Sequence, residues 1–129
     1  MTDGPTDAAP EALAEGELAP DRVAELSREG EAQIVDVRTH AEHEVSRIPG
    51  ARHVPLDELG AHAASIDRER PVVFVCRVGE RSAMAAEGFR ASGWDAHTMA
   101  GGLVAWSEQG LPLEPEGAHV AHHSALPDR

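Results

Sequence analysis

The sequence has 129 residues, a single cysteine, no tyrosine, and an aromatic content of only 3%. One cysteine excludes an intramolecular disulfide. Because aromatic side chains are so few, the core must be aliphatic. A hydrophobic content of 41% is enough to form such a core. No segment approaches the roughly 18 consecutive apolar residues of a membrane span. The amino terminus lacks the basic start and apolar run of a secretory signal, so we expect a cytoplasmic protein.

Positive charge is also scarce. The formal net charge is -12 and the sequence pI is about 4.9. Such a chain repels phosphate backbones and anionic lipid, so neither nucleic acid nor a membrane surface is an expected partner. The length suits one domain, because two domains would each be too small to bury a good core.

The two ends differ in composition from the middle of the chain. Residues 1–17 are rich in Ala, Pro, Asp and Glu and predict a disordered acidic leader. Residues 115–129 predict a disordered tail containing His119, His122 and His123. Composition alone is weak support for a metal site there, so we expect a polar tail and no metal. The folded domain is therefore expected at residues 18–114.

Strand-like and helix-like segments alternate within this domain. Short apolar runs predict strands at 34–37, 51–54, 71–75 and 96–99. Helical spacing predicts helices at 20–29, 42–45, 56–66, 81–91 and 103–109. The alternation indicates an α/β fold with a small parallel sheet flanked by helices on both faces. The run at 71–75 is apolar throughout, which is typical of a strand buried on both faces.

Cys76 stands directly after that strongest strand, and a glycine-containing loop leads from it into a helix. Functional sites of open parallel sheets form at the carboxyl ends of strands. A loop that enters a helix N-terminus points backbone N–H groups inward, and Gly79 permits the backbone angles that it needs. Arg77 and Arg81 add positive charge, which favours the nucleophilic thiolate. The alternative is a buried core cysteine, which would need no such electropositive loop.

Four stretches together resemble the rhodanese family, from about residue 17 to 114. They are the active-site loop 76–82, the Asp-x-Arg strand at 34–38, the Ile-Pro-Gly-Ala segment at 48–51, and the closing segments at 101–106 and 110–112. The family usually has Gly-His before Ile-Pro-Gly-Ala, whereas this chain has Ser46-Arg47. That segment is interpreted as architectural, so the departure bears on partner binding more than on catalysis.

The resemblance implies a sulfurtransferase in which Cys76 takes a sulfane sulfur from a small anionic donor such as thiosulfate. The persulfide then passes its sulfur to cyanide or an external thiol, and no bound cofactor is implied. The loop residues expected to bind the sulfur anion are Arg77, Val78, Gly79, Glu80, Arg81 and Ser82. Their N–H groups and arginine side chains would stabilise it electrostatically.

Two further residues are candidates for a supporting role. Asp36 either orients Arg81 and the loop or forms an ordinary strand-end ion pair, and for Arg38 the ion pair is favoured. Ser82 can cap the helix that follows the loop or donate to a bound anion. Glu80 is expected to face solvent, where it would disfavour highly charged substrates.

Histidine and tryptophan carry weaker signals. His40 and His43 are not expected to be catalytic, because a thiolate attacks without a general base. Trp94 and Trp106 are expected to pack in the core or at its rim.

Two competing functions follow from the same fold. Phosphatases that share it use a Cys-x5-Arg loop wide enough for phosphate, but Arg81 is five positions after Cys76, which gives Cys-x4-Arg. The shorter loop and Glu80 favour a single sulfur atom. The other alternative is a non-catalytic binding module. Such modules often lack the cysteine, which this chain keeps.

Overall fold

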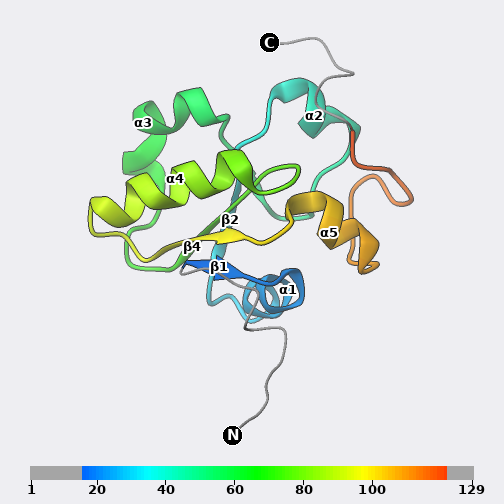
Figure 1. Ribbon diagram of the computed structural model, residues 1–129, viewed down its shortest axis with the longest axis horizontal. Coiled ribbons are helices and arrows are strands. Elements are labelled where there is room, and N and C mark those ends of the chain that lie inside the picture. The colour runs from blue at the N-terminus through cyan, green and yellow to red at the C-terminus, as the bar shows by residue number, and fades with distance from the viewer. Residues whose placement is uncertain (1–15, 122–129) are drawn as a thin grey trace, which may run out of the picture.

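A sheet of five parallel strands forms the centre of the molecule. Figure 1 shows this sheet between the helices. The computed structural model describes residues 16–121. The strands lie in the order β1-β5-β4-β2-β3, with β4 in the middle of the sheet. Their bounds are Glu17–Leu18 (β1), Gln33–Asp36 (β2), Arg52–His53 (β3), Val72–Val75 (β4) and Ala96–Met99 (β5). All pairs in this sheet are parallel, which confirms the expected fold class.

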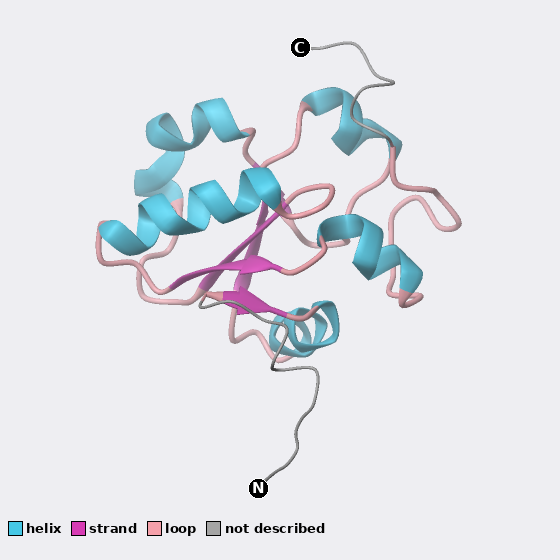
Figure 2. Ribbon diagram, in the orientation of Figure 1, coloured by secondary structure: helices cyan, strands magenta, loops and turns pink. Residues whose placement is uncertain are grey.

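Helices cover both faces of the sheet (Figure 2). Their bounds are Pro20–Arg28 (α1), His40–Val45 (α2), Leu59–His62 (α3), Glu80–Ala91 (α4) and Gly102–Glu108 (α5), with 3-10 turns at Leu56–Glu58 (η3) and Ala63–Ser65 (η4). Helices α1 and α5 contribute Val23, Leu103 and Trp106 to one core cluster. Helices α3 and α4 contribute Leu59 and Ala86 to the other.

Strand β4 explains why the core has two halves. Successive side chains of a strand point to opposite faces. Val72 and Phe74 belong to the cluster under α3 and α4, whereas Val73 and Val75 belong to the cluster under α1 and α5. All of these side chains are 0% exposed. Cys76 continues the alternation and packs on the α4 side, so the strand itself aims the sulfur toward the start of α4.

Most predicted elements are confirmed, with shifts at their ends. The segment at 56–66 is not one helix but η3, α3 and η4 in succession. The strand expected at 51–54 shortens to Arg52–His53. The edge strand β1 was not predicted, because its two residues carry no alternating pattern. Trp106 is 2% exposed in the core and Trp94 packs against the other cluster, as expected.

The chain stays in contact with the domain beyond residue 114. Arg47 and Glu114 form an isolated antiparallel bridge. Val120 packs against the core, and Ala121 is 4% exposed. The boundary at 114 remains a prediction. Residues 1–15 of the leader predicted at 1–17 lie outside the described residues, whereas Glu17 belongs to β1. Residues 122–129 of the predicted tail, including His122 and His123, also lie outside the described residues.

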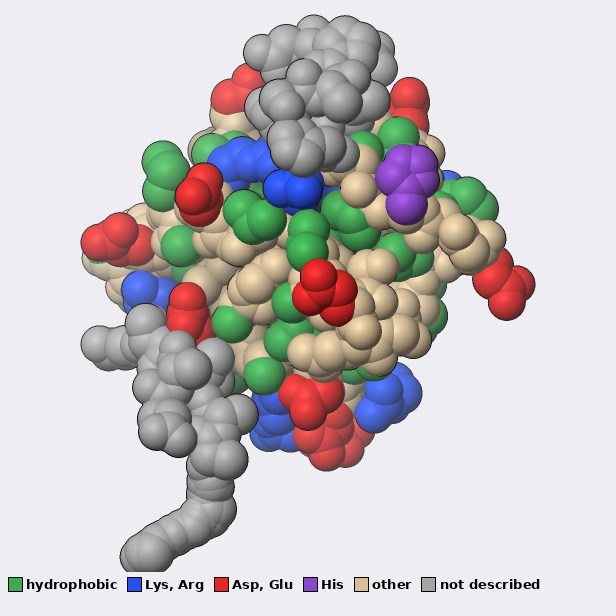
Figure 3. All heavy atoms as spheres, turned by 45° about the vertical axis from the view of Figure 1, so that its right-hand side comes forward, with side chains coloured by type: hydrophobic (Ala, Val, Ile, Leu, Met, Phe, Trp, Pro, Cys, Tyr) green, Lys and Arg blue, Asp and Glu red, His purple; other side chains and the backbone are tan. Residues whose placement is uncertain are grey.

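Membrane-spanning helices are absent from the described part of the chain, since none of its helices is long and apolar enough. Acidic and basic side chains lie beside one another on the face drawn in Figure 3.

Candidate active site

Cys76 lies at the bottom of the loop between β4 and α4, and its side chain is 1% exposed. The backbone N–H groups of Gly79 and Ser82 point at its sulfur, with N–Sγ distances of 3.1 and 3.4 Å. Gly79 has a φ of 107°, a left-handed conformation that a residue with a Cβ rarely adopts. The loop is therefore a nest of N–H donors around the sulfur, which suits a thiolate or another anion.

Ser82 adds a third polar group to this nest. Its hydroxyl lies 3.4 Å from Cys76 Sγ and 2.6 Å from the hydroxyl of Thr98. The expectation that Ser82 caps α4 is wrong, because the N-cap residue is Gly79 and no side chain caps the helix. Ser82 is instead the third residue of α4, within the first turn, and its side chain is fully buried.

The start of α5 holds the outer side of the loop. The N–H groups of Leu103 and Val104 donate to the carbonyls of Cys76 and Arg77 at 2.8 and 3.0 Å. Gly102 makes this approach possible, since its φ is 63° and a Cβ there would lie 2.6 Å from the Cys76 oxygen. The carbonyls of Cys76 and Arg77 therefore point toward α5, on the outside of the loop. The N–H groups of Gly79 and Ser82 point inward to the sulfur.

Arg81 is bound by Glu42 from α2. Its two terminal nitrogens donate to the two carboxylate oxygens at 2.7 and 3.0 Å. The side chain of Glu42 is 0% exposed and that of Arg81 is 25% exposed. The hydrogen bond to Glu42 raises the pKa of Arg81 above its ordinary value. Arg81 therefore stays cationic and fixed, and the reading in which Asp36 orients it is wrong.

Glu42 is a site residue that the sequence interpretation missed. It is the third residue of α2 and forms a capping box with Thr39, whose N–H and hydroxyl both donate to Glu42 Oε1 at 3.1 Å. Burial alone would raise its pKa, but the hydrogen bonds from Arg81 and Thr39 outweigh burial and lower it. The Thr-x-x-Glu pattern at 39–42 was the available signal, since it marks a helix start.

Asp36 and Arg38 form a buried ion pair with each other. Both side chains are 0% exposed, and Arg38 Nη2 lies 2.8 Å from Asp36 Oδ2. The same nitrogen donates to the carbonyl of Ser46 at 2.6 Å. Ser46 Oγ and Arg38 Nη1 are buried without a hydrogen-bond partner among the described residues. The pair thus anchors the segment after α2 rather than touching the loop.

The remaining loop residues surround the entrance. Val78 is 42% exposed, and Glu80 faces solvent as expected. Arg77 is half-buried, and its Nε has no partner in the described part of the chain. Of the predicted loop residues, Gly79 and Ser82 hydrogen-bond with the Cys76 sulfur, whereas Arg81 binds Glu42. The guanidinium of Arg77 is less committed to protein partners than that of Arg81.

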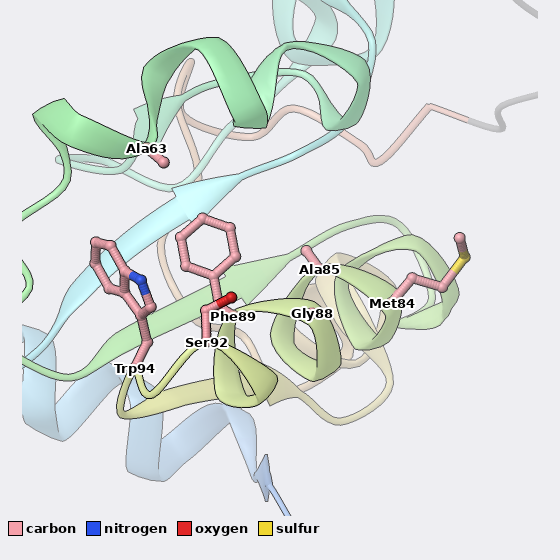
Figure 4. A pocket seen from close by; sticks show the side chains of 7 residues that line it. All are labelled: Ala63, Met84, Ala85, Gly88, Phe89, Ser92 and Trp94. Carbon is pink, nitrogen blue, oxygen red and sulfur yellow. The ribbon is translucent and has the colours of Figure 1, made fainter.

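An apolar pocket of about 280 Å³ lies on the same side of the sheet but apart from Cys76. Figure 4 shows the side chains that line it: Ala63, Met84, Ala85, Gly88, Phe89, Ser92 and Trp94. None of these residues is titratable or belongs to the loop at 76–82. The pocket therefore offers apolar packing and is separate from the N–H nest around Cys76.

Three histidine rings meet beside α2. His43 stacks on His53 with ring centroids 4.1 Å apart, and His40 meets the same ring edge-on at 4.9 Å. His53 Nε2 lies 2.7 Å from the Arg38 carbonyl. None of the three rings contacts Cys76 through a hydrogen bond given by the structure, and no metal-binding cluster occurs among residues 16–121.

We predict an acid-sensitive stability that comes from His43. Burial first, and then the neighbouring His53, lower the pKa of His43 from 6.5 to about 4. The unfolded chain therefore binds a proton more readily, and the free energy of unfolding falls as pH drops from about 6.5 to about 4. His43→Gln should flatten this part of the profile, measured by urea unfolding across pH. The exposed His119→Gln is the matched control, and a slope unchanged by His43→Gln would contradict the assignment.

A second prediction concerns the Glu42–Arg81 pair. Glu42→Gln should lower the free energy of unfolding by about 2 kcal/mol, less than a fully buried pair would lose, because Arg81 reaches solvent. Glu42→Gln should also slow sulfur transfer, because the Arg81 guanidinium would no longer be held in one position beside the loop. Urea unfolding and turnover measure the two effects, and Glu87→Gln on the exposed face of α4 is the control. Wild-type values for both would show that the pair does not hold the loop.

Comparison with known proteins agrees with this geometry. The model of the rhodanese-like domain family matches residues 19–109. A thiosulfate sulfurtransferase of Pseudomonas aeruginosa is 36% identical over 90 residues, which cover 69% of this chain and 81% of that protein. A rhodanese-like domain protein of Staphylococcus aureus matches with a TM-score of 0.66 and 31% identity over 82% of this chain and 98% of that one.

A third similar protein is larger than this chain. An HTH-type transcriptional regulator of Mycobacterium tuberculosis is 36% identical over 96 residues, which cover 72% of this chain but only 42% of the regulator. The similarity therefore concerns one part of that protein. Because the family model spans most of the described residues, the chain belongs to the rhodanese-like domain family.

Proposed function

We propose that the protein is a sulfurtransferase that carries a sulfane sulfur on Cys76 as a persulfide. The observation that carries the proposal is the nest at the end of β4. There, two backbone N–H groups and one hydroxyl converge on a buried sulfur. Nothing in a structural core requires two backbone N–H groups to donate to a cysteine sulfur in this way. The similarity to thiosulfate sulfurtransferases supports the same reading.

In the first half-reaction the Cys76 thiolate attacks the outer sulfur of thiosulfate. A new S–S bond forms on Cys76, the S–S bond of the donor breaks, and sulfite leaves with the electron pair. The negative charge then resides on the terminal sulfur of the persulfide. The loop N–H groups and the Arg77 side chain, whose Nε is otherwise unpartnered among the described residues, are the groups that can stabilise it.

In the second half-reaction an external nucleophile attacks the terminal sulfur. Cyanide becomes thiocyanate, or a thiolate becomes a persulfide, and the Cys76 thiolate leaves. No second cysteine exists in the sequence. The persulfide therefore has no internal thiol to resolve it and waits for an outside acceptor.

A regulatory or binding module is the second candidate, because of the similarity to part of a transcriptional regulator. Such a module need not catalyse sulfur transfer. A phosphatase is less favoured, although a similar structure from Rhodopseudomonas palustris is described as a "Possible Tyrosine Phosphatase". Arg81 is five positions after Cys76, which gives a shorter loop than the Cys-x5-Arg loop of those phosphatases. The Arg81 guanidinium also donates to Glu42, so it is not free to bind a phosphate.

Two-substrate kinetics test the proposal. With thiosulfate and cyanide varied together, double-reciprocal plots should be parallel, because sulfite leaves before the acceptor binds. Intersecting plots would indicate a ternary complex and contradict the persulfide cycle. Absence of turnover with cyanide and with small thiols would favour the regulatory module.

A further inference from the structure

Thr98 on β5 carries a buried hydroxyl that none of the roles above uses. Its oxygen lies 2.6 Å from the Ser82 hydroxyl, and its side chain is 5% exposed. The strand register pairs Thr98 with Phe74 of β4, which places it beside the carboxyl end of the strand that carries Cys76. Thr98, Ser82 and the cysteine sulfur thus form a row of three polar atoms with two contacts between them.

The protons of this row can be counted. With Cys76 as a thiolate, the row holds two hydroxyl protons for two contacts, so Thr98 donates to Ser82 and Ser82 donates to the sulfur. With Cys76 as a thiol, the sulfur donates to Ser82 Oγ, as the structure gives the contact, and the row holds three protons for the same two contacts. One proton then lacks an acceptor within the row, and leaving a buried donor unpaired costs free energy.

The direction of the row is fixed by Thr98. The structure gives the Thr98 hydroxyl no other hydrogen-bond partner among the described residues. If Ser82 turned its proton toward Thr98, the Thr98 proton would have no acceptor, and the sulfur would keep only the N–H groups of Gly79 and Ser82. Thr98 as the donor is the arrangement that satisfies all three groups when the sulfur is ionised.

We propose that Thr98 is a positioning residue that acts through Ser82. By donating to Ser82 Oγ it holds that oxygen beside Cys76 Sγ, makes the Ser82 hydroxyl a stronger donor and so stabilises the thiolate. This inference deepens the proposed function and rests on it for its catalytic meaning. The thiolate attacks the donor in the first half-reaction and is the leaving group in the second, so both steps benefit from the same proton.

The test is the pH profile of Cys76 alkylation by iodoacetamide. Thr98→Val keeps the β-branched shape and removes the hydroxyl, so the profile should move to higher pH. Alkylation at neutral pH should slow about tenfold, because Ser82 Oγ loses the partner that holds it beside the sulfur and its hydrogen bond to the charged thiolate weakens. Thr98→Ser keeps the hydroxyl and should restore the wild-type profile. Thr98→Ala is the second variant if valine perturbs the fold.

Removing Ser82 separates positioning from packing. In a Ser82→Ala background, Thr98→Val should have no further effect on the profile, because the relay is already broken. An unchanged profile in Thr98→Val, or an equal shift with and without Ser82, would overturn the proposal. Alkylation needs no sulfur transfer, so it tests Thr98 even if the wild-type protein fails to turn over, which would refute only the proposed function.

Discussion

Replacing Cys76 by serine is expected to abolish sulfur transfer while leaving the domain folded. A hydroxyl fits the space of the thiol and can accept from the N–H groups of Gly79 and Ser82, which lie 3.1 and 3.4 Å from the sulfur. It cannot form a persulfide, so turnover with thiosulfate and cyanide should disappear. The free energy of unfolding should change by no more than about 1 kcal/mol, as for a conservative substitution.

Circular dichroism and urea unfolding provide the control for this variant. Cys76→Ala serves as a second variant, since it also lacks the sulfur but adds no hydroxyl. Turnover above about a hundredth of the wild-type rate, which is two powers of ten or roughly 2.7 kcal/mol of barrier, would rule out Cys76 as the sulfur carrier.

Replacing Gly102 by alanine is expected to have the next largest effect. A Cβ at this position would overlap the Arg77 carbonyl and lie 2.6 Å from the Cys76 oxygen, and the φ of 63° is already unfavourable for alanine. The hydrogen bonds from Leu103 and Val104 to the loop carbonyls should break. The N–H nest would then lose its shape, and sulfur transfer should fall roughly a hundredfold.

Gly88→Ala is the matched control. Gly88 lies within α4, and a Cβ built there meets nothing within 4 Å. That variant should keep its activity and gain about 0.5–1 kcal/mol of stability from the higher helix propensity of alanine. If Gly102→Ala turned over at the wild-type rate, α5 would not be what shapes the loop.

Most of the fold could be predicted from the sequence, because the patterns that mark its strands and helices lie within single short segments. The apolar run at 71–75 predicts a central strand, and β4 is buried on both faces at Val72–Val75. The helices predicted at 20–29 and 81–91 end within one residue of those bounds, and Gly30 and Gly93, both with a positive φ, follow them. Edge strand β1 and the broken helix at 56–66 were missed, because tertiary packing rather than sequence pattern decides such short pieces.

Only the part of the site that lies within one segment could be predicted from the sequence. Cys76 and its loop are contiguous, so their proximity follows from the sequence. Glu42, Thr98 and Gly102 come from three other segments, and their places depend on strand order and register. Asp36 was a plausible partner for Arg81 because parallel strands end at one edge. However, Arg38 is two residues away on the same segment and donates to both oxygens of the Asp36 carboxylate.

Intact-mass spectrometry after incubation with thiosulfate shows whether Cys76 carries sulfur. With the acceptor withheld and excess donor removed, the protein should gain the mass of one sulfur atom, located on Cys76 by peptide mapping. Addition of cyanide should return the mass to its starting value, and Cys76→Ser should show no increase at any stage. An unmodified wild-type protein, or an added sulfur that persists in Cys76→Ser, would rule out the Cys76 persulfide.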